Sequence, residues 1–546
     1  MKKILLLFFV LMLSINVKAV SENKMSDLSF FDYYKDSIIE VKFMKNSRDN
    51  ILKKYKNAEY KMDLTYYEED VTEINSMENS IDDVDEYENI KIFGWLEKKG
   101  EDSYILYVES PDIIYFTNCN KMFSNYINLE KISFSNVSTM LVTDMSYMFE
   151  NAQSLSELDV SSFNTSYVND MSHMFFVDSG KYMGNLRKIK GLDKFDTKNV
   201  TNMSHMFAGL RYIEELDVSK FNTEKVTNMS GMFFNLQNLR KLELSKFNTK
   251  NVTDMSSMFM WCESLKKIDL SSFDTSNVTS MESMIRGKLL EEIVFGNFNT
   301  EKVTNMYMMF LGCESLKKLS LNFNTKNVTN MERMFADCYN LEELDIKSFD
   351  TSKVENMSFM FDRCYKLKNI NLKNFNTGNV INMRDMFQDC HALKSLDLSS
   401  FDTSKVNNMY AMFSRCYNLK EINVSSFDTS NVTNMGYMFN NCKNLEKLDI
   451  SNFNTKSAED LSYMFRKCEK LNDLKLDRSI FKVDTSIKTN NIFEDAGKYN
   501  NMSLFLFTNI YLLYIGGFVI LVVIAIIVFL VIKKYKKRKS NIKQGK

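Results

Sequence analysis

Hydrophobic residues recur along most of this chain with a period of about 26 positions. The marker of each copy is a Met-Phe pair or its equivalent. Successive markers lie 26 residues apart ten times, 25 apart twice and 32 apart once. A period of this size is typical of stacked supersecondary units, so the pattern predicts a solenoid that grows turn by turn. The markers begin at Met122, Met148, Met174, Met206, Met232, Met258, Met284, Met309, Met334, Met360, Met386, Met412, Met438 and Met464.

Each copy divides into three segments with different hydrophobic spacing. A Thr/Asn-x-Met-x-x-Met-Phe-x-x-Cys segment has apolar residues at i, i+3, i+4 and i+7, which predicts a short helix. A Leu-x-x-Leu-x-Leu segment, as in Leu265–Leu270, predicts a short strand with one buried face. A polar loop with one inward Phe closes the turn. Strands stacked about 4.8 Å apart would form one parallel sheet. The pattern therefore predicts an α/β solenoid of about 14 turns with a parallel sheet on one face.

Both ends of the chain carry segments outside the array. Residues 1–19 combine Lys2 and Lys3 with an apolar run and predict a secretory signal peptide, with an uncleaved anchor as the alternative. Residues 510–532 are uncharged and long enough for one transmembrane helix, with a buried core helix as the alternative. The basic tail at 533–546 then predicts a cytoplasmic C-terminus. Together these segments predict a single-pass cell-membrane protein with an extracellular N-terminal part and the lipid bilayer as a partner of 510–532.

The other segments complete the predicted domain order. An N-terminal segment at 20–90 is expected to be partly helical, with one or two helices between Asp27 and Lys61. Its end at 67–90 has ten acidic residues and no Lys or Arg, which is typical of a solvated or disordered stretch. Two strands predict a β cap at 91–117, and the solenoid follows at 118–481. A C-terminal cap and stalk are expected at 482–509.

Composition and charge argue against several classes of function. Lys and Arg number 69 against 70 Asp and Glu, so the charge does not indicate a nucleic-acid partner. Most of the nine cysteines occupy one slot that also accepts Ala or Leu, which favours buried free thiols over inter-turn disulfides or metal ligands. His173 and His205 share a slot of successive turns and are expected to be neighbouring, solvent-facing helix residues, with a metal pair as the alternative. With no clustered nucleophile, base or metal motif, the sequence predicts neither an enzyme nor a cofactor.

The outward positions of the strands are the predicted binding face. Inward positions of a solenoid are fixed by the core, whereas outward positions are free to vary. Stacked like charges cost stability, so a partly acidic column is expected to have a reason. A solvated face of mixed charge is the alternative. The candidate residues are Asp159, Asp217, Glu243, Asp269, Asp345, Asp397, Asp449, Lys241, Lys267, Lys318 and Lys447.

The repeat resembles a known family of bacterial surface proteins. The segment Asn-Val-Thr-Asn-Met-x-x-Met-Phe-x-x-Cys at Asn431–Cys442, followed by Leu-x-x-Leu-Asp at Leu445–Asp449, is similar to the BspA-like leucine-rich repeat proteins. More narrowly, it resembles the mycoplasma-type 26-residue surface repeats of unknown function. The resemblance covers about 92–481. It implies a leucine-rich-repeat-like right-handed solenoid and a surface role, often adhesion, and it supplies no catalytic residues.

Two hypotheses of function follow from the sequence. The first is a membrane-anchored cell-surface module that binds a host or neighbouring-cell protein or glycan. The second is a structural surface coat that self-associates without a dedicated ligand.

Overall fold

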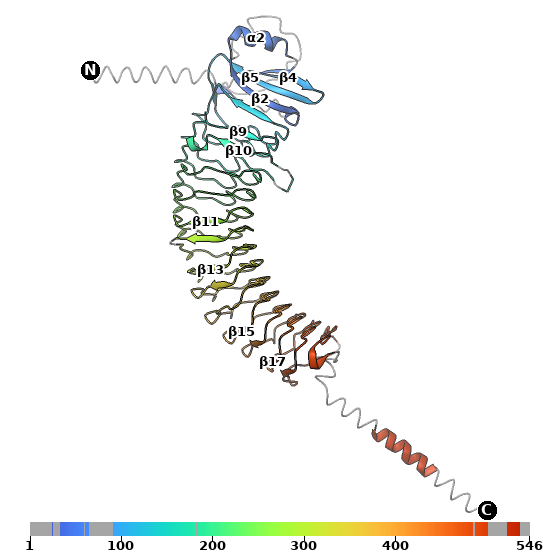
Figure 1. Cartoon of the computed structure of the whole chain (residues 1–546). Coiled ribbons are helices and arrows are strands. Elements are labelled where there is room, and N and C mark those ends of the chain that lie inside the picture. Colours follow the sequence, from blue (N-terminus) through green and yellow to red (C-terminus); the bar gives the residue numbers. More distant parts are fainter. Residues whose placement is uncertain are drawn as a thin grey trace, which may run out of the picture. The chain divides into compact units, whose positions relative to one another are not determined.

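The computed structural model describes residues 24–25, 33–58, 60–64, 91–178, 180–181, 184–296, 298–483, 486–500 and 521–534 (Figure 1). The chain forms two compact units, Met1–Leu341 and Glu342–Lys546, and each is described by itself. The predicted signal peptide at 1–19 and the acidic stretch at 67–90 lie outside the described residues. The tail beyond residue 534 also lies outside them.

A five-stranded sheet forms the N-terminal part of the first unit (Figure 1). Its antiparallel members β4 (Phe93–Gly100) and β5 (Ser103–Ser110) lie where the sequence predicts two strands. The strand β2 (Ile38–Lys45) runs parallel to both β5 and β7 (Lys131–Phe134). Because β7 belongs to the first turn of the array, β2 joins the N-terminal segment to the repeats. The strand order is β3 (Tyr60–Asp63), β4 (Phe93–Gly100), β5 (Ser103–Ser110), β2 (Ile38–Lys45) and β7 (Lys131–Phe134).

The described part of the N-terminal segment holds one helix where the sequence predicts one or two. This helix, α2 (Arg48–Lys56), packs Ile51 and Tyr55 against Phe93 and Trp95 of β4. The strand β2, which lies between β5 and β7, was missed, because its inward alternation is short and is interrupted by a register shift near its start. A second small parallel sheet combines β1 (Lys24–Met25), β6 (Ile114–Phe116) and β8 (Val137–Ser138).

The core of the array consists of columns in which each turn supplies the same residue. The aromatic rings of successive Met-Phe markers stack on one another, as between Phe207 and Phe233, whose centroids are 6.1 Å apart, and Ile285 interrupts this column. Phe413 and Phe439 repeat this contact at 5.4 Å in the second unit. The valines of the loops are fully buried, Val200 and Val432 among them. Burial of these columns removes apolar surface from water along every turn, which is the main stabilising term.

The predicted helix of each repeat is wrong, and consecutive tight turns take its place. Within one repeat, Met148 N–H donates to the carbonyl of Met145 three residues back. Alternate amides instead donate across to the next turn: Tyr147 to Ser172 O at 2.9 Å and Phe149 to Met174 O at 2.8 Å. These amides cannot also make the i to i−4 bonds of a helix. Tyr147 adopts a left-handed conformation, with φ 57°, which redirects the chain.

The predicted continuous sheet is also wrong, because the strands are short and pair in separate small groups. These strands have three or four residues, with polar loops between them, and they pair only where the backbone stays extended. In the first unit these strands are β9 (Glu157–Asp159), β10 (Lys188–Lys190), β11 (Lys267–Leu270), β12 (Glu292–Phe295) and β13 (Lys318–Ser320), with a 3-10 turn η3 (Leu192–Lys194). In the second unit they are β14 (Glu343–Asp345), β15 (Ser395–Asp397), β16 (Glu421–Asn423), β17 (Lys447–Ile450) and β18 (Asp473–Leu476), with a 3-10 turn η4 (Gly497–Tyr499).

Threonine side chains connect the loops of successive turns. The fully buried Thr403 hydroxyl donates to Asp428 O and accepts from Asp428 N–H, both at 2.8 Å. Thr223 makes the same pair of bonds to Asn248. Each hydroxyl therefore satisfies a carbonyl and an amide that the short strands leave without a ladder partner.

The prediction of a transmembrane helix over 510–532 is contradicted. The described part of this stretch forms an apolar helix at 521–534, and residues 510–520 lie outside the described residues. A spanning helix needs about 20 residues. Among the described residues, none of the helices has the length and hydropathy required to cross a membrane. The same finding contradicts the predicted single-pass cell-membrane location, with its extracellular N-terminal part and cytoplasmic C-terminus.

Candidate binding face

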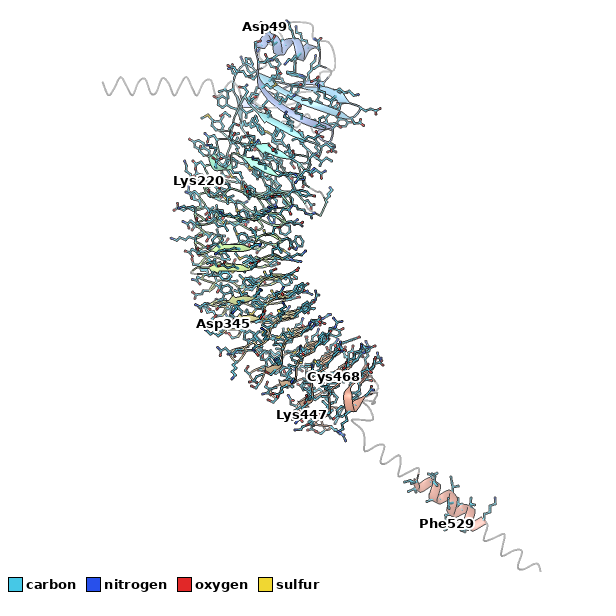
Figure 2. The ribbon with its side chains drawn as sticks, viewed as in Figure 1. Asp49, Lys220, Asp345, Lys447, Cys468 and Phe529 are labelled. Carbon is cyan, nitrogen blue, oxygen red and sulfur yellow. The ribbon has the colours of Figure 1, made fainter. Side chains whose placement is uncertain are left out.

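The eleven candidate residues all lie on the outward side of the turns. Asp397 and Asp449 are exposed, and Leu396 and Leu448 beside them in the sequence are buried. Figure 2 shows Asp345 and Lys447 at the outer edge of the second unit, whereas Cys468 lies inside it. Of the set, Asp345 is half-buried and the others are exposed.

The seven outward acidic residues have a structural role that the sequence did not reveal. Each carboxylate accepts hydrogen bonds from the residue two positions later. Ser161 Oγ donates to Asp159 at 2.6 Å, and Ser451 Oγ donates to Asp449 at 2.6 Å. These bonds lower the pKa of all seven carboxyl groups, because they stabilise the charged form. The carboxylates therefore cap the loops that follow the strands, which explains why stacked acids are tolerated.

Opposite charges on neighbouring turns pair across the face. Lys267 Nζ lies 3.0 Å from a carboxylate oxygen of Glu292, its register partner on β12. Lys475 Nζ of β18 lies 3.8 Å from Asp449. Both pairs are exposed, so each contributes little to stability. What they do is hold the ends of long side chains in defined positions.

A shallow groove of about 230 Å³ brings two of the candidate residues together. It crosses β16, β17 and β18 in the second unit, with Ile422 and Leu448 at its base. Its charged lining residues are Glu421, Lys447, Asp449, Asp473 and Lys475. The sequence placed Lys447 and Asp449 in this face. Asp473 occupies the position of this last turn that corresponds to Lys447, although it was not among the candidates.

A larger open groove lies on the strand side of the first unit. It has a volume of about 610 Å³, and it is lined by Glu130, Lys131, Ser154, Ser156, Glu157 and Asn185. Lys190 Nζ contacts Glu157 beside it at 3.0 Å. None of the eleven candidate residues lines this groove, because its residues come from the irregular first turns.

His173 and His205 are neighbours, as the sequence predicted, but they are half-buried residues of tight turns and not solvent-facing residues of a helix. Their rings stack at 4.8 Å, and Tyr147 stacks on the other side of His173 at 4.5 Å. Burial, together with His205, lowers the pKa of His173 to about 4. Within the described part of the chain, neither Nδ1 atom has a hydrogen-bond partner. Parallel rings do not aim their nitrogens at one point, and the described residues contain no cluster of three or more metal-binding side chains.

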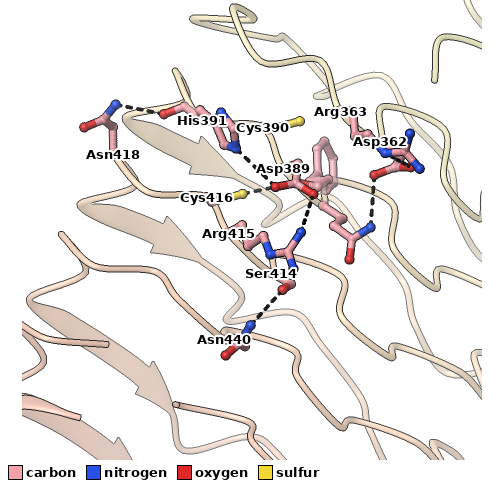
Figure 3. A network of polar contacts seen from close by, with 12 residues as sticks. Asp362, Arg363, Asp389, Cys390, His391, Ser414, Arg415, Cys416, Asn418 and Asn440 are labelled. Atoms are coloured by element: carbon pink, nitrogen blue, oxygen red, sulfur yellow. Dashed lines mark hydrogen bonds and ion pairs between the residues drawn. The ribbon is translucent and has the colours of Figure 1, made fainter. Parts of the chain in front are cut away.

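A second histidine cluster lies in the second unit (Figure 3). His391 Nε2 contacts Asp389 at 3.1 Å, and Arg415 Nη1 contacts the other oxygen of Asp389 at 3.3 Å. Tyr365 and Tyr417 enclose the His391 ring at 4.6 and 4.5 Å. The two thiols drawn with this network belong to Cys390 and Cys416. Burial raises the pKa of Cys416 to about 12, so its thiol is poorly suited as a nucleophile.

All nine cysteines are buried and free, which confirms the predicted thiol slot. The thiol of Cys442 donates to the carbonyl of Phe413 in the preceding turn at 3.2 Å, and Cys468 does the same to Phe439 at 3.1 Å. The cysteine side chain at this position therefore fills space in the core, and its thiol donates a hydrogen bond to a buried backbone carbonyl.

Comparisons with known proteins agree with a repeat architecture. The family described as "Mycoplasma protein of unknown function, DUF285" matches residues 99–188, 180–289, 288–396 and 382–504. No curated protein matches the chain.

The solved structures that are similar include leucine-rich repeat proteins. A leucine-rich repeat protein of Leptospira interrogans is 13% identical, with 64% of this chain and 78% of that chain covered and a TM-score of 0.17. TLR13 in complex with ssRNA13 is 14% identical, with 69% and 54% covered and a TM-score of 0.15. A TDR receptor is 14% identical, with 67% and 75% covered and a TM-score of 0.17. These scores are too low for an argument about function.

Proposed function

We propose that this chain, which belongs to the DUF285 family of mycoplasma proteins, is a non-enzymatic module that binds a protein or glycan partner through its outward strand face. The observation that carries the proposal is the groove over β16–β18, where Lys447, Asp449 and Lys475 surround an apolar base. Extended solenoid surfaces usually bind macromolecules. The resemblance of the repeat to BspA-like adhesion proteins supports the same role.

The arrangement of the face supports selective recognition. Hydrogen bonds from the following loops hold the carboxylates, and neighbouring turns hold lysines such as Lys475. Side chains ordered before binding lose less conformational entropy on association. A mixed pattern of fixed charges also rejects partners that place like charges opposite it.

The proposal is tested by a binding screen with a charge-reversed variant. The full chain is screened against immobilised matrix proteins and glycans, and each hit is measured again with Lys447→Glu. Lys447 lines the groove and has no ion-pair partner among the described residues, so its reversal changes the charge of the face without breaking an ion pair. The matched control is Lys456→Glu, an exposed loop lysine away from the groove. We expect Lys447→Glu to weaken binding at least tenfold and Lys456→Glu to leave it unchanged.

Two results would count against the proposal. Equal binding by both variants would remove the groove from the interface. Concentration-dependent self-assembly in sedimentation, without binding to any partner, would favour the structural-coat hypothesis instead.

A further inference from the structure

The groove over β16–β18 presents its charges in two columns that run across the strands. The register of β17 and β18 pairs Lys447 with Asp473, and two residues farther along it pairs Asp449 with Lys475. Glu421 occupies the same position of β16 as Lys447 does of β17. The first column therefore alternates in sign along Glu421, Lys447 and Asp473. The second column consists of Asp449 and Lys475.

The two columns differ in whether their charges are already paired. In the second column, Lys475 Nζ lies 3.8 Å from one oxygen of Asp449, and the other oxygen accepts from Ser451 Oγ at 2.6 Å. In the first column, none of the three side chains makes an ion pair within the part of the chain that the structure describes. The charges of the first column are therefore available to a partner.

The mixture of signs restricts the charge of that partner. The groove is lined by three carboxylates and two ammonium groups. A polyanion, such as a sulfated glycan, would place like charges against the carboxylates, and a polycation would do the same against the lysines. A neutral glycan would cover Lys447 without supplying a counter-charge, which costs free energy. A partner whose charges alternate in sign fits best, and a protein segment can supply that alternation.

The base of the groove favours a helix over an extended segment. Ile422 is half-buried and Leu448 is buried, so the base offers apolar surface. The backbone of β17 already pairs with that of β18, so an extended peptide in the groove could not add to the sheet as a further strand. Its amides would then lie over an apolar base without partners. A helix satisfies its own backbone and brings only side chains to the groove.

The spacing of the first column also matches a helix. Neighbouring strands lie about 4.8 Å apart. One turn of a helix rises about 5.4 Å, whereas residues on one side of an extended strand are about 6.6 Å apart. Over the three positions of the column, the side chains of a helix would drift from their partners by about 1 Å and those of an extended segment by about 4 Å.

We propose that the groove binds an amphipathic helix of a partner protein, which lies across β16, β17 and β18 and presents a basic, an acidic and a basic residue at i, i+4 and i+7. The inference rests on the proposed function, because it names the partner class of the same groove. The acidic residue of the helix pairs with Lys447, and its two basic residues pair with Glu421 and Asp473. The aliphatic parts of these long side chains cover Ile422 and Leu448.

Two helical peptides of equal composition test this pattern. Both carry two lysines and one glutamate on a single face, and a side-chain cross-link on the opposite face holds the helix before binding. The matched peptide has the order Lys, Glu, Lys at i, i+4 and i+7, and the permuted peptide has the order Lys, Lys, Glu. Fluorescence anisotropy measures the binding of each labelled peptide to the full chain. We expect the permuted peptide to bind about tenfold more weakly, because two of its three charges meet like charges.

A charge exchange tests whether the helix lies over Lys447. Lys447→Glu should weaken binding of the matched peptide about tenfold, because the central glutamate then meets a carboxylate. A third peptide, with lysine at all three positions, should bind this variant more tightly than the matched peptide does. Lys456→Glu, at the exposed loop position away from the groove, should bind the matched peptide like the parent chain. Both positions are exposed, so neither change should unfold the array.

The outcomes separate this inference from the proposed function. Equal binding of the matched and permuted peptides would overturn the inference, and so would an unchanged peptide preference in Lys447→Glu. A matrix protein or glycan that loses binding in Lys447→Glu, while the matched peptide does not bind even at millimolar concentration, would support the proposed function and exclude the helix. If Lys447→Glu affected neither a screened partner nor the matched peptide, both proposals would be wrong.

Discussion

The threonine contacts between loops provide a direct test of how the array is held together. Thr403→Val keeps the shape of the side chain but removes the hydroxyl that donates to Asp428 O and accepts from Asp428 N–H. Each buried backbone group left without a partner costs roughly 1–3 kcal/mol. Asp428 itself is exposed, so water can reach part of its backbone, and we expect a loss near the lower limit for two groups, about 2 kcal/mol. That corresponds to roughly a 30-fold larger unfolding equilibrium constant.

Native-state hydrogen exchange on the full chain is the suitable assay, because a repeat array need not unfold in one step. Amides of the turns next to Thr403 should exchange about 30-fold faster in the variant. Thr403→Ser should restore most of the protection, since it keeps the hydroxyl. Thr433→Val serves as the control, because that hydroxyl makes one 3.2 Å bond at a half-buried position. If Thr403→Val and Thr433→Val behaved alike, the hydroxyls would not connect the turns energetically.

Three further predictions follow from the same structure. Gly231→Ala should lower the thermal midpoint, because the glycine has φ 58° and a Cβ there would lie 2.4 Å from His205 Nε2; an unchanged midpoint would contradict the tight turn. The free energy of unfolding should fall as the pH drops from about 6.5 to 4, because His173 is protonated in the unfolded chain before it is protonated in the folded chain, where its pKa is about 4. Urea unfolding curves measured over a series of pH values should show this fall, and His173→Phe should reduce it. A second loss should begin below about pH 4, since the pKa values of Asp159 and Asp449 are lowered in the folded state. A thiol reagent should label the native protein slowly at all nine cysteines and all of them rapidly in denaturant, and fast native labelling would contradict the buried slot.

The candidate face shows how far sequence reasoning reaches for a repeat protein. The period identified which residues face outward, and the structure places all eleven on that side. The period could not show that Asp159 and Asp449 cap the loops that follow them. That role depends on the loop backbone, which brings the hydroxyls of Ser161 and Ser451 to the carboxylates.

The helix of each repeat was mispredicted for a related reason. Met-x-x-Met-Phe has the spacing of a helical face, and the same spacing also buries residues in a series of tight turns. The choice between them depends on whether the amides bond within the segment or to the next turn, as Phe149 does to Met174. Left-handed residues such as Tyr147 and His173 carry no sequence mark of that conformation.

By itself, the sequence determined the number and spacing of the turns, the residues of the core columns and the buried thiol slot. These follow from the sequence because the buried position of each turn needs an apolar residue, so apolar residues recur at a fixed interval. The tertiary structure decided the backbone of each turn, since hydrogen bonds to a neighbouring turn outweigh local helical preference. It decided the short separate strands and the loop contacts of Thr403 for the same reason. It also decided the position of β2 between β5 and β7, because pairing with these two strands brings together segments far apart in the chain.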